Sequence, residues 1–220
     1  VLAIFILLGV NATFASEHGN ETLMMHESAL EMSVEETPSE ILGENSGSYV
    51  DLKKDIDTTP PGGVLKLQKD YKFNSTRDTP SAGIYTCVPV TKSITIDGQN
   101  NIIDGEGCQR GILDITGSNV VLKNIIFKNG YNTGNGGCIY AHGTSNFQLI
   151  NCTFQDSIAG TYGGAVELVS AHNTTIRSCN FINNSAKLSS VPRGGAINWV
   201  SSTGGTIADC NFIKNSAEYG

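Results

Sequence analysis

The sequence predicts an all-β protein: a single-stranded parallel β-helix with a short N-terminal capping helix. One observation is a strand pattern that recurs four times and ends at Phe127, Phe154, Phe181 and Phe212, at spacings of 27, 27 and 31 residues. The other is a Gly-Gly signature with matching spacings, which begins at Gly136, Gly163 and Gly194. A repeat of this length cannot bury its apolar face alone, so it must stack on its own copies.

The short helix comes first in the predicted fold, around Asp51 to Ile56, because Leu52 and Ile56 lie four residues apart before a Pro-Pro-Gly-Gly stop. A first strand over 64–67 follows it. Alternating strands ended by turn residues are then expected at 94–98, 101–105 and 111–115. We interpret the four-residue insertion between Phe181 and Gly194 as an enlarged surface loop.

Three apolar columns recur within the repeat. They are Leu122/Leu149/Ile176/Ile207, Ile125/Cys152/Cys179/Cys210 and the four Phe. The last two columns lie two residues apart, as one face of a strand requires, but the first two lie three apart. Between them stand Asn124, Asn151, Ser178 and Asp209. Asn and Asp tolerate a left-handed backbone, so we expect a bend at this column.

A third strand follows each Gly-Gly signature, at 139–141, 166–168 and 197–199. Its first and third residues are expected to point inward. Its middle residue, Tyr140, Glu167 or Asn198, is expected in solvent. The repeat should therefore contain about three strands and three corners.

Two N-terminal segments differ from the repeats. Residues 1–15 combine an apolar run with small residues before Ala15, which predicts a truncated signal peptide and is too short for a membrane helix of ~20 residues. Residues 16–47 contain eight Glu and no Lys or Arg, which predicts a disordered acidic linker. The predicted β-helix spans 48–220 and is incomplete at its C-terminus. The net charge of -7 excludes a basic nucleic-acid binder.

The sequence contains six cysteines, which could form disulfides or bind a metal. Cys152, Cys179 and Cys210 share one inward column, so we interpret them as stacked buried thiols. Whether Cys87 and Cys108 form a disulfide across neighbouring coils stays open. The sequence has no Cys-x-x-Cys or His-rich spacing that would predict zinc.

The acidic residues of the body gather at Asp97, Asp104, Glu106 and Asp114. Asp-Gly turn chemistry accounts for the first two, and a Ca²⁺ site needs six or more converging oxygens; a metal or catalytic role is the alternative. His142 and His172 lie at different offsets from the next Phe and are interpreted as ordinary loop histidines. We therefore predict no catalytic, cofactor-binding or metal-binding residue. Glycosylation sequons begin at Asn74, Asn151, Asn173 and Asn183, of which Asn74 and Asn173 fall in expected loops.

The motifs resemble known families. Phe-x-x-Asn at 181–184 and 212–215, with Gly-Gly-Ala-Ile at 194–197, resembles the repeat pair of polymorphic outer-membrane proteins. The layout of leader, spacer, capping helix and coils resembles the adhesin-like proteins of methanogenic archaea. Gly130 and Ser157 replace the motif Asn, and Cys138 replaces Ala. The resemblance implies a right-handed, pectate-lyase-like helix on the cell surface that contacts host cells, other microbes or glycans.

The predicted function is thus that of a secreted or cell-surface adhesin-like binding module without enzymatic activity or cofactor. Its partners would be glycans or proteins, and its attachment to membrane or cell wall would lie beyond Gly220. One alternative is a polysaccharide lyase or glycoside hydrolase on the same scaffold, for which the sequence lacks a convergent acid–base group. Another is a structural stalk that carries a C-terminal domain.

Overall fold

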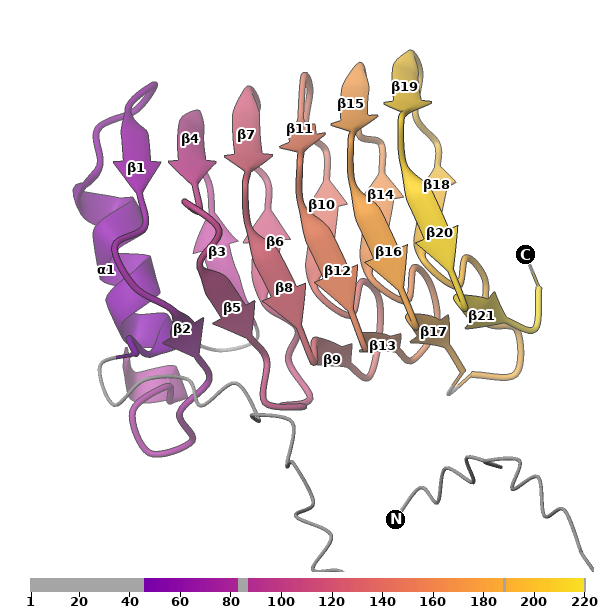
Figure 1. The fold of residues 1–220 in the computed structure, drawn as a ribbon, viewed down its shortest axis with the longest axis horizontal. Helices are drawn as coiled ribbons and strands as arrows, with labels where there is room; N and C mark the ends of the chain where they lie inside the picture. Colours follow the sequence, from indigo (N-terminus) through magenta and orange to yellow (C-terminus); the bar gives the residue numbers. More distant parts are fainter. Residues whose placement is uncertain (1–45, 83–86, 188, 220) are drawn as a thin grey trace, which may run out of the picture. The chain divides into compact units, whose positions relative to one another are not determined.

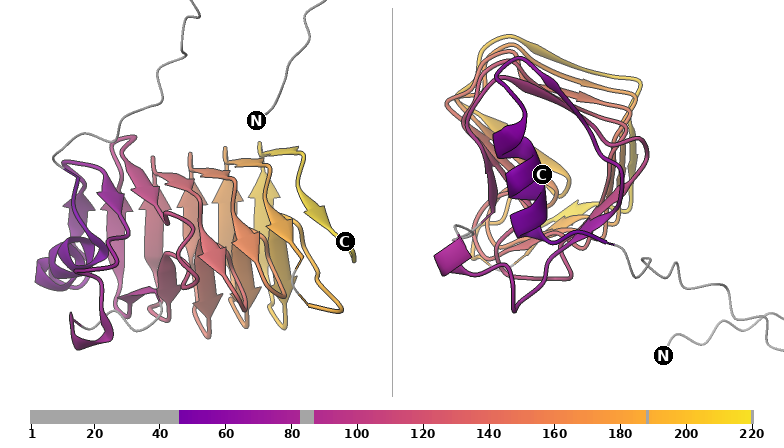
Figure 2. Two further views of the ribbon diagram at one scale, coloured as in Figure 1. Left: turned by 90° about the horizontal axis from the view of Figure 1, so that it is seen from below. Right: turned by 90° about the vertical axis from the view of Figure 1, so that its left-hand side faces the viewer.

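The computed structural model describes residues 46–82, 87–187 and 189–219. The predicted signal peptide and nearly all of the predicted acidic linker lie outside these residues. The described chain winds into a parallel β-helix whose coils stack one on the next (Figures 1 and 2). None of the helices in these ranges is long and apolar enough to cross a membrane.

The predicted capping helix is confirmed as α1 (Tyr49–Thr58), which lies across the N-terminal end of the stack (Figure 2). Ser48 and Asp51 form a capping box at its start. Tyr49, Leu52 and Ile56 are buried against the first coil. Gly47, the last residue of the predicted linker, already pairs with Tyr71.

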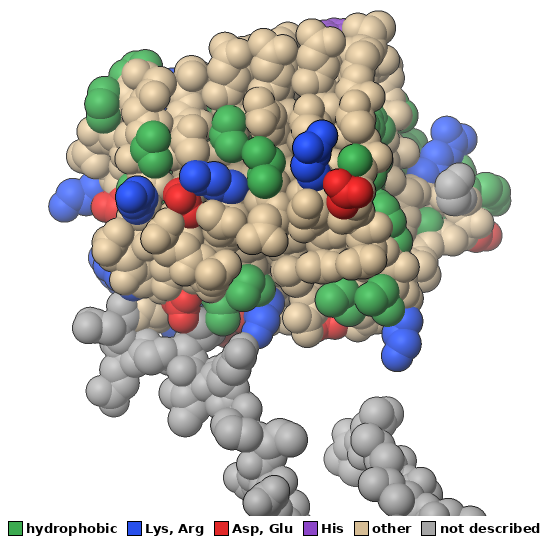
Figure 3. All heavy atoms as spheres, turned by 45° about the horizontal axis from the view of Figure 1, so that its top comes forward, with side chains coloured by type: hydrophobic (Ala, Val, Ile, Leu, Met, Phe, Trp, Pro, Cys, Tyr) green, Lys and Arg blue, Asp and Glu red, His purple; other side chains and the backbone are tan. Residues whose placement is uncertain are grey.

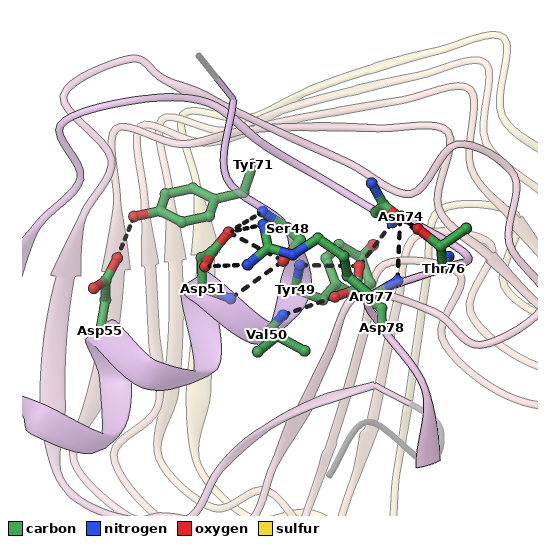
Figure 4. A network of polar contacts seen from close by, with 10 residues as sticks. All are labelled: Ser48, Tyr49, Val50, Asp51, Asp55, Tyr71, Asn74, Thr76, Arg77 and Asp78. Carbon is green, nitrogen blue, oxygen red and sulfur yellow. Dashed lines mark hydrogen bonds and ion pairs between the residues drawn. The ribbon is translucent and has the colours of Figure 1, made fainter. Parts of the chain in front are cut away.

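A buried carboxylate ties α1 to the loop that follows the first coil. Asp78 is 1% exposed and accepts hydrogen bonds from the backbone N–H groups of Tyr49, Val50 and Asn74, at 3.1, 2.8 and 2.7 Å (Figure 4). Beside it, Arg77 pairs with Asp51 at 2.8 Å. Burial raises the pKa of Asp51, but hydrogen bonds from Arg77 and Ser48 outweigh it and lower the pKa to about 2. The helix N-terminus is therefore fully capped.

Four parallel sheets, A to D, run along the stack. The chain enters them in the order B, A, D and C, and they are described in that order. Sheet B contains β1 (Val64–Lys66), β4 (Ile94–Asp97), β7 (Val120–Lys123), β11 (Gln148–Ile150), β15 (Thr174–Arg177) and β19 (Gly205–Ala208). Sheet A contains β2 (Tyr71–Lys72), β5 (Ile102–Asp104), β8 (Ile126–Lys128), β12 (Thr153–Gln155), β16 (Asn180–Ile182) and β20 (Asn211–Ile213).

The chain then passes through two further sheets before it returns to sheet B. Sheet D contains β9 (Tyr131–Asn132), β13 (Ile158–Ala159), β17 (Ser185–Ala186) and β21 (Ser216–Ala217). Sheet C contains β3 (Val88–Val90), β6 (Leu113–Ile115), β10 (Ile139–His142), β14 (Val166–Val169) and β18 (Ile197–Val200). A short 3₁₀ helix, η1 (Pro80–Ala82), precedes β3. The predicted three strands per coil are confirmed for the coils β1–β3 and β4–β6, which contain no strand of sheet D. From β7 onward each coil has a fourth strand that was not predicted, because the two-residue strands of sheet D lack a recognisable apolar pattern.

The predicted apolar columns are confirmed by the register of the strands. Leu149 lies between Leu122 and Ile176, and Phe154 lies between Phe127 and Phe181. The Phe rings stack in parallel, with centroids 4.8–5.0 Å apart. This spacing equals that of neighbouring strands, so each ring packs on its own copy.

The bend predicted between sheets B and A is also confirmed. Asn124, Asn151, Ser178 and Asp209 have φ values of 54, 50, 55 and 54°. Three further left-handed columns that contain non-glycine residues were not predicted. The first is Asn129, Asp156, Asn183 and Lys214; the second includes Asn119, Asn146 and Asn173; the third includes Ser170 and Ser201. The corners are therefore more numerous than the three expected, and Asn recurs in them because its short amide tolerates this conformation.

The motif asparagines form a ladder inside the helix. Asn184 is fully buried, and its amide donates to the carbonyls of Phe154, at 3.0 Å, and of the Asn215 side chain, at 2.9 Å. Asn215 repeats this bond to Phe181, at 2.8 Å. A buried amide must find partners, and here the neighbouring coils supply them.

The Gly-Gly signature is explained by close backbone approach. A Cβ on Gly163, whose φ is +63°, would lie 2.2 Å from the carbonyl oxygen of Val166. A Cβ on Gly164 would lie 2.0 Å from the carbonyl oxygen of Gly195 in the next coil. Neither position has room for a side chain.

Stability should depend on the Phe column. We expect Phe154→Asp to lower the free energy of unfolding by more than the ~3–5 kcal/mol typical of Phe truncation, because it also buries a charge. Thr153→Asp, on the half-buried outward side of the same strand, should cost less than about 1 kcal/mol. Urea unfolding of both variants measures the difference. Equal losses in the two variants would contradict the stacked interior.

Candidate binding face on sheet C

The acidic residues that the sequence groups together are divided by the fold. The Asp97 carboxylate accepts from Asn124 at 2.9 Å and pairs with Lys123 at 3.1 Å; these contacts outweigh burial and lower its pKa. Asp104 accepts from Asn129 and from the backbone of Glu106. Both carboxylates therefore serve the corners of their coils. In the part of the chain that the structure describes, no three His, Cys, Asp or Glu side chains are grouped to hold a metal.

Asp114 instead joins a polar column on the outer face of sheet C. The strand register places it beside Tyr140, Tyr140 beside Glu167, and Glu167 beside Asn198. Together with His142, these side chains form what we call the sheet C face. The predicted alignment of Tyr140, Glu167 and Asn198 is confirmed, and Asp114, which was not predicted to join them, lies in the same column. Its signal was present, because Gly111-Ile112-Leu113-Asp114 aligns with Gly137-Cys138-Ile139-Tyr140.

The prediction that His142 is a loop histidine was wrong, because His142 is the last residue of strand β10. Its Nε2 lies 3.1 Å from Oδ1 of Asp114, and its ring stacks on Tyr140 with centroids 4.5 Å apart. His172 does lie at a corner, where its Nδ1 accepts from the backbone N–H of Thr203 at 3.1 Å. Only His142 therefore contributes to the sheet C face.

Glu167 differs most from its prediction. The side chain of Glu167 lies on the outer side of the sheet, as expected, yet the residue is only 1% exposed. It is covered because it lies between Tyr140 and Asn198 on the neighbouring strands. Oε1 accepts from the Asn198 amide at 3.1 Å, and Oε2 is buried without a hydrogen-bond partner. Burial raises the pKa of Glu167 to about 7, although the bond from Asn198 opposes the shift. The pKa of Tyr140 is raised by its own partial burial and by the negative charges of Glu167 and Asp114.

A second candidate surface is a shallow hollow between sheets A and D. It is lined by Glu106, Gly107, Asn129, Gly130, Tyr131, Asp156 and Ile158. Its acidic groups already have partners: Glu106 lies 3.8 Å from Lys72, and Asp156 accepts from Asn183. The hollow therefore offers fewer unsatisfied groups to a ligand than the sheet C face does.

The outer side of sheets B and A carries charges of both signs. Lys66, Asp97, Lys123 and Arg177 share one column of sheet B. In Figure 3 basic and acidic side chains are interspersed across this side of the molecule. It presents no broad patch of a single sign.

The remaining candidates are structural. Cys152 and Cys179 are buried thiols, as predicted, while Cys210 is half-buried in the last coil. Cys108 is a thiol whose pKa is raised by burial, and Cys87 donates to the carbonyl of Arg110, so no disulfide joins them here. Among the sequons, Asn151 and Asn183 bond to the preceding coil, and Asn74 accepts from Thr76 in its own turn.

The burial of Glu167 predicts a pH-dependent stability. Its pKa rises from 4.5 to about 7 on folding, so its stabilising contribution is complete below pH 4.5 and is lost as the pH rises through 7. Glu167→Gln, which keeps the neutral form, should gain about 1–2 kcal/mol over the parent between pH 4 and pH 8. This value is reduced from the full shift because solvent lies close to the outer face. Denaturant unfolding at both pH values checks it, and a pH-independent difference would contradict the buried carboxyl.

Comparison with known proteins agrees with the observed architecture. Residues 74–220, more than half of the chain, match the family model described as right handed beta helix region. No curated protein and no solved structure matches the chain. Since the family model covers the coils from β3 onward, including the sheet C face, the chain belongs to the right-handed β-helix family.

Proposed function

We propose that the chain is an adhesin-like binding module that works outside the cell and binds glycans with its sheet C face. The observation that carries the proposal is the set of Asp114, Tyr140, His142, Glu167 and Asn198 on one side of one sheet. Carboxylates and amides bond sugar hydroxyls, and an aromatic ring at the surface, such as that of half-buried Tyr140, packs on the apolar side of a sugar. The leader-like residues 1–15 support the extracellular location.

The architecture suits an extended ligand. Parallel strands present side chains at steps of about 4.8 Å along the stack, so a chain of sugars can contact several coils in turn. The side chains are set by a rigid ladder of strands, which lowers the entropy lost on binding. The module thus offers a preformed surface rather than a loop that must order.

A glycoside hydrolase is the second candidate, favoured by one observation. Asp114 and Glu167 share a column two strands apart, a Cα separation of about 9.6 Å from the usual strand spacing. This is close to the ~6.5–9.5 Å between carboxyl groups of inverting glycosidases, and a pKa of about 7 suits a general acid. However, Tyr140 stands between the two carboxyl groups, where the reacting sugar and water would have to lie. Binding is therefore the better-supported function.

Glycan binding can be tested with the whole chain on an array of immobilised glycans. We expect specific retention that Tyr140→Ala weakens about tenfold or more, which corresponds to ~1.4 kcal/mol. Tyr162→Ala, an aromatic residue outside the sheet C strands, should change the affinity less than twofold. Retention of no glycan, or equal losses in both variants, would refute the proposal.

The same glycans distinguish binding from hydrolysis. Incubation with the retained glycan should release no new reducing ends. If ends are released, and Glu167→Gln abolishes their release, the hydrolase replaces the binding module as the function of this face.

A further inference from the structure

One carboxylate oxygen of Glu167 is buried and has no hydrogen-bond partner. Of the described residues, three have a buried side-chain oxygen or nitrogen without a hydrogen-bond partner: Tyr49, Glu167 and Trp199. The first and last are neutral groups. Only Glu167 can bear a charge there, and it is 1% exposed.

A buried carboxylate oxygen without a partner is costly, because its charged form loses hydration and gains nothing in return. Asn198 supplies a single neutral donor, at 3.1 Å, to the other oxygen. The group that would satisfy the vacant oxygen best is a cation that also donates hydrogen bonds.

The surroundings of Glu167 favour such a cation. Asp114 supplies a second carboxylate on the same column, and the five strands of sheet C contain neither Lys nor Arg. The basic group among those strands is His142, which already faces Asp114. An ammonium group would therefore meet attraction from two carboxylates and no competing strand-borne lysine or arginine.

Tyr140 adds an aromatic surface between these carboxylates. An ammonium that contacts its ring gains a cation–π interaction, and the carboxylates on either side add electrostatic attraction. Tyr140 and Asn198, which cover Glu167, are themselves half-buried on the outer surface. A change of rotamer in either side chain gives a ligand access without disturbing the core.

We propose that the sheet C face selects glycans that carry protonated primary amines, with Glu167 as the residue that recognises the amine. This inference rests on the proposed glycan-binding function and names the class of glycan. An N-acetylated sugar keeps its shape but lacks the positive charge, so the face should reject it relative to the free amine.

The test compares two probes, a glucosamine hexamer and the N-acetylglucosamine hexamer, by calorimetric titration of the whole chain at pH 6.5. We expect the glucosamine hexamer to bind at least tenfold more tightly. Glu167→Gln should weaken the binding of the glucosamine hexamer at least tenfold and so remove this preference.

A control is needed because the chain carries a net charge of -7 and attracts any polycation. Glu106→Gln makes the same Glu-to-Gln substitution at an exposed carboxylate outside the sheet C face, where it removes at least as much negative charge, and it should leave the preference intact. Equal losses in Glu106→Gln and Glu167→Gln would overturn the inference, since general charge attraction would then explain the preference.

The remaining outcomes separate the two proposals. Equal binding of both hexamers by the parent chain would overturn the amine selectivity and leave glycan binding in place. Binding of neither hexamer, while neutral glycans are retained, would also overturn the selectivity alone. Binding of no glycan of any class would overturn the proposed function and this inference together.

Discussion

Each inward side chain of the stacked coils must pack against the side chain at the equivalent position one coil away. Flat Phe rings, small Cys thiols and branched aliphatic residues satisfy this requirement, because they stack at the spacing of neighbouring strands. Buried Asn184 and half-buried Asn215 satisfy it in a second way, by donating hydrogen bonds to the backbone of the preceding coil. Most other features of the fold, including the left-handed corners and the Gly-Gly approach, serve to keep these columns aligned.

The same requirement explains how the repeats tolerate changes of residue. Cys138 replaces the small Ala of the signature, and a Cβ on Gly130 would lie only 2.5 Å from its sulfur. Gly130 stands where the motif has Asn, and the next coil has Ser157, whose hydroxyl lies 2.9 Å from that sulfur. The three departures therefore compensate one another. Gly130 leaves room for the thiol of Cys138, which is larger than the Ala side chain, and Ser157 is short enough to contact that thiol through its hydroxyl.

The columns were predictable because inward packing imposes a period on the sequence, and the corner at Asn124 was predictable because it breaks the alternation of the strand. The two-residue strands of sheet D were not, since too few residues carry a pattern there. The candidate site was predictable only in part. Alternation places Glu167 on the outer side, but its burial depends on the size of Tyr140 and Asn198 in adjacent coils, which lie far away in sequence. The loop assignment of His142 was wrong because its partner, Asp114, lies 28 residues before it in the sequence.

Stacking also has a consequence for how such a surface can evolve. Each coil contacts its immediate neighbours, so duplication or deletion of one 27-residue unit preserves the packing on either side. Loss of the unit that carries Tyr140 would bring Asp114 directly beside Glu167, and gain of a unit between them would move them one step further apart. The separation of these acids can thus change only in discrete increments of about 4.8 Å, so that ligand size is encoded by repeat number as well as by side-chain identity.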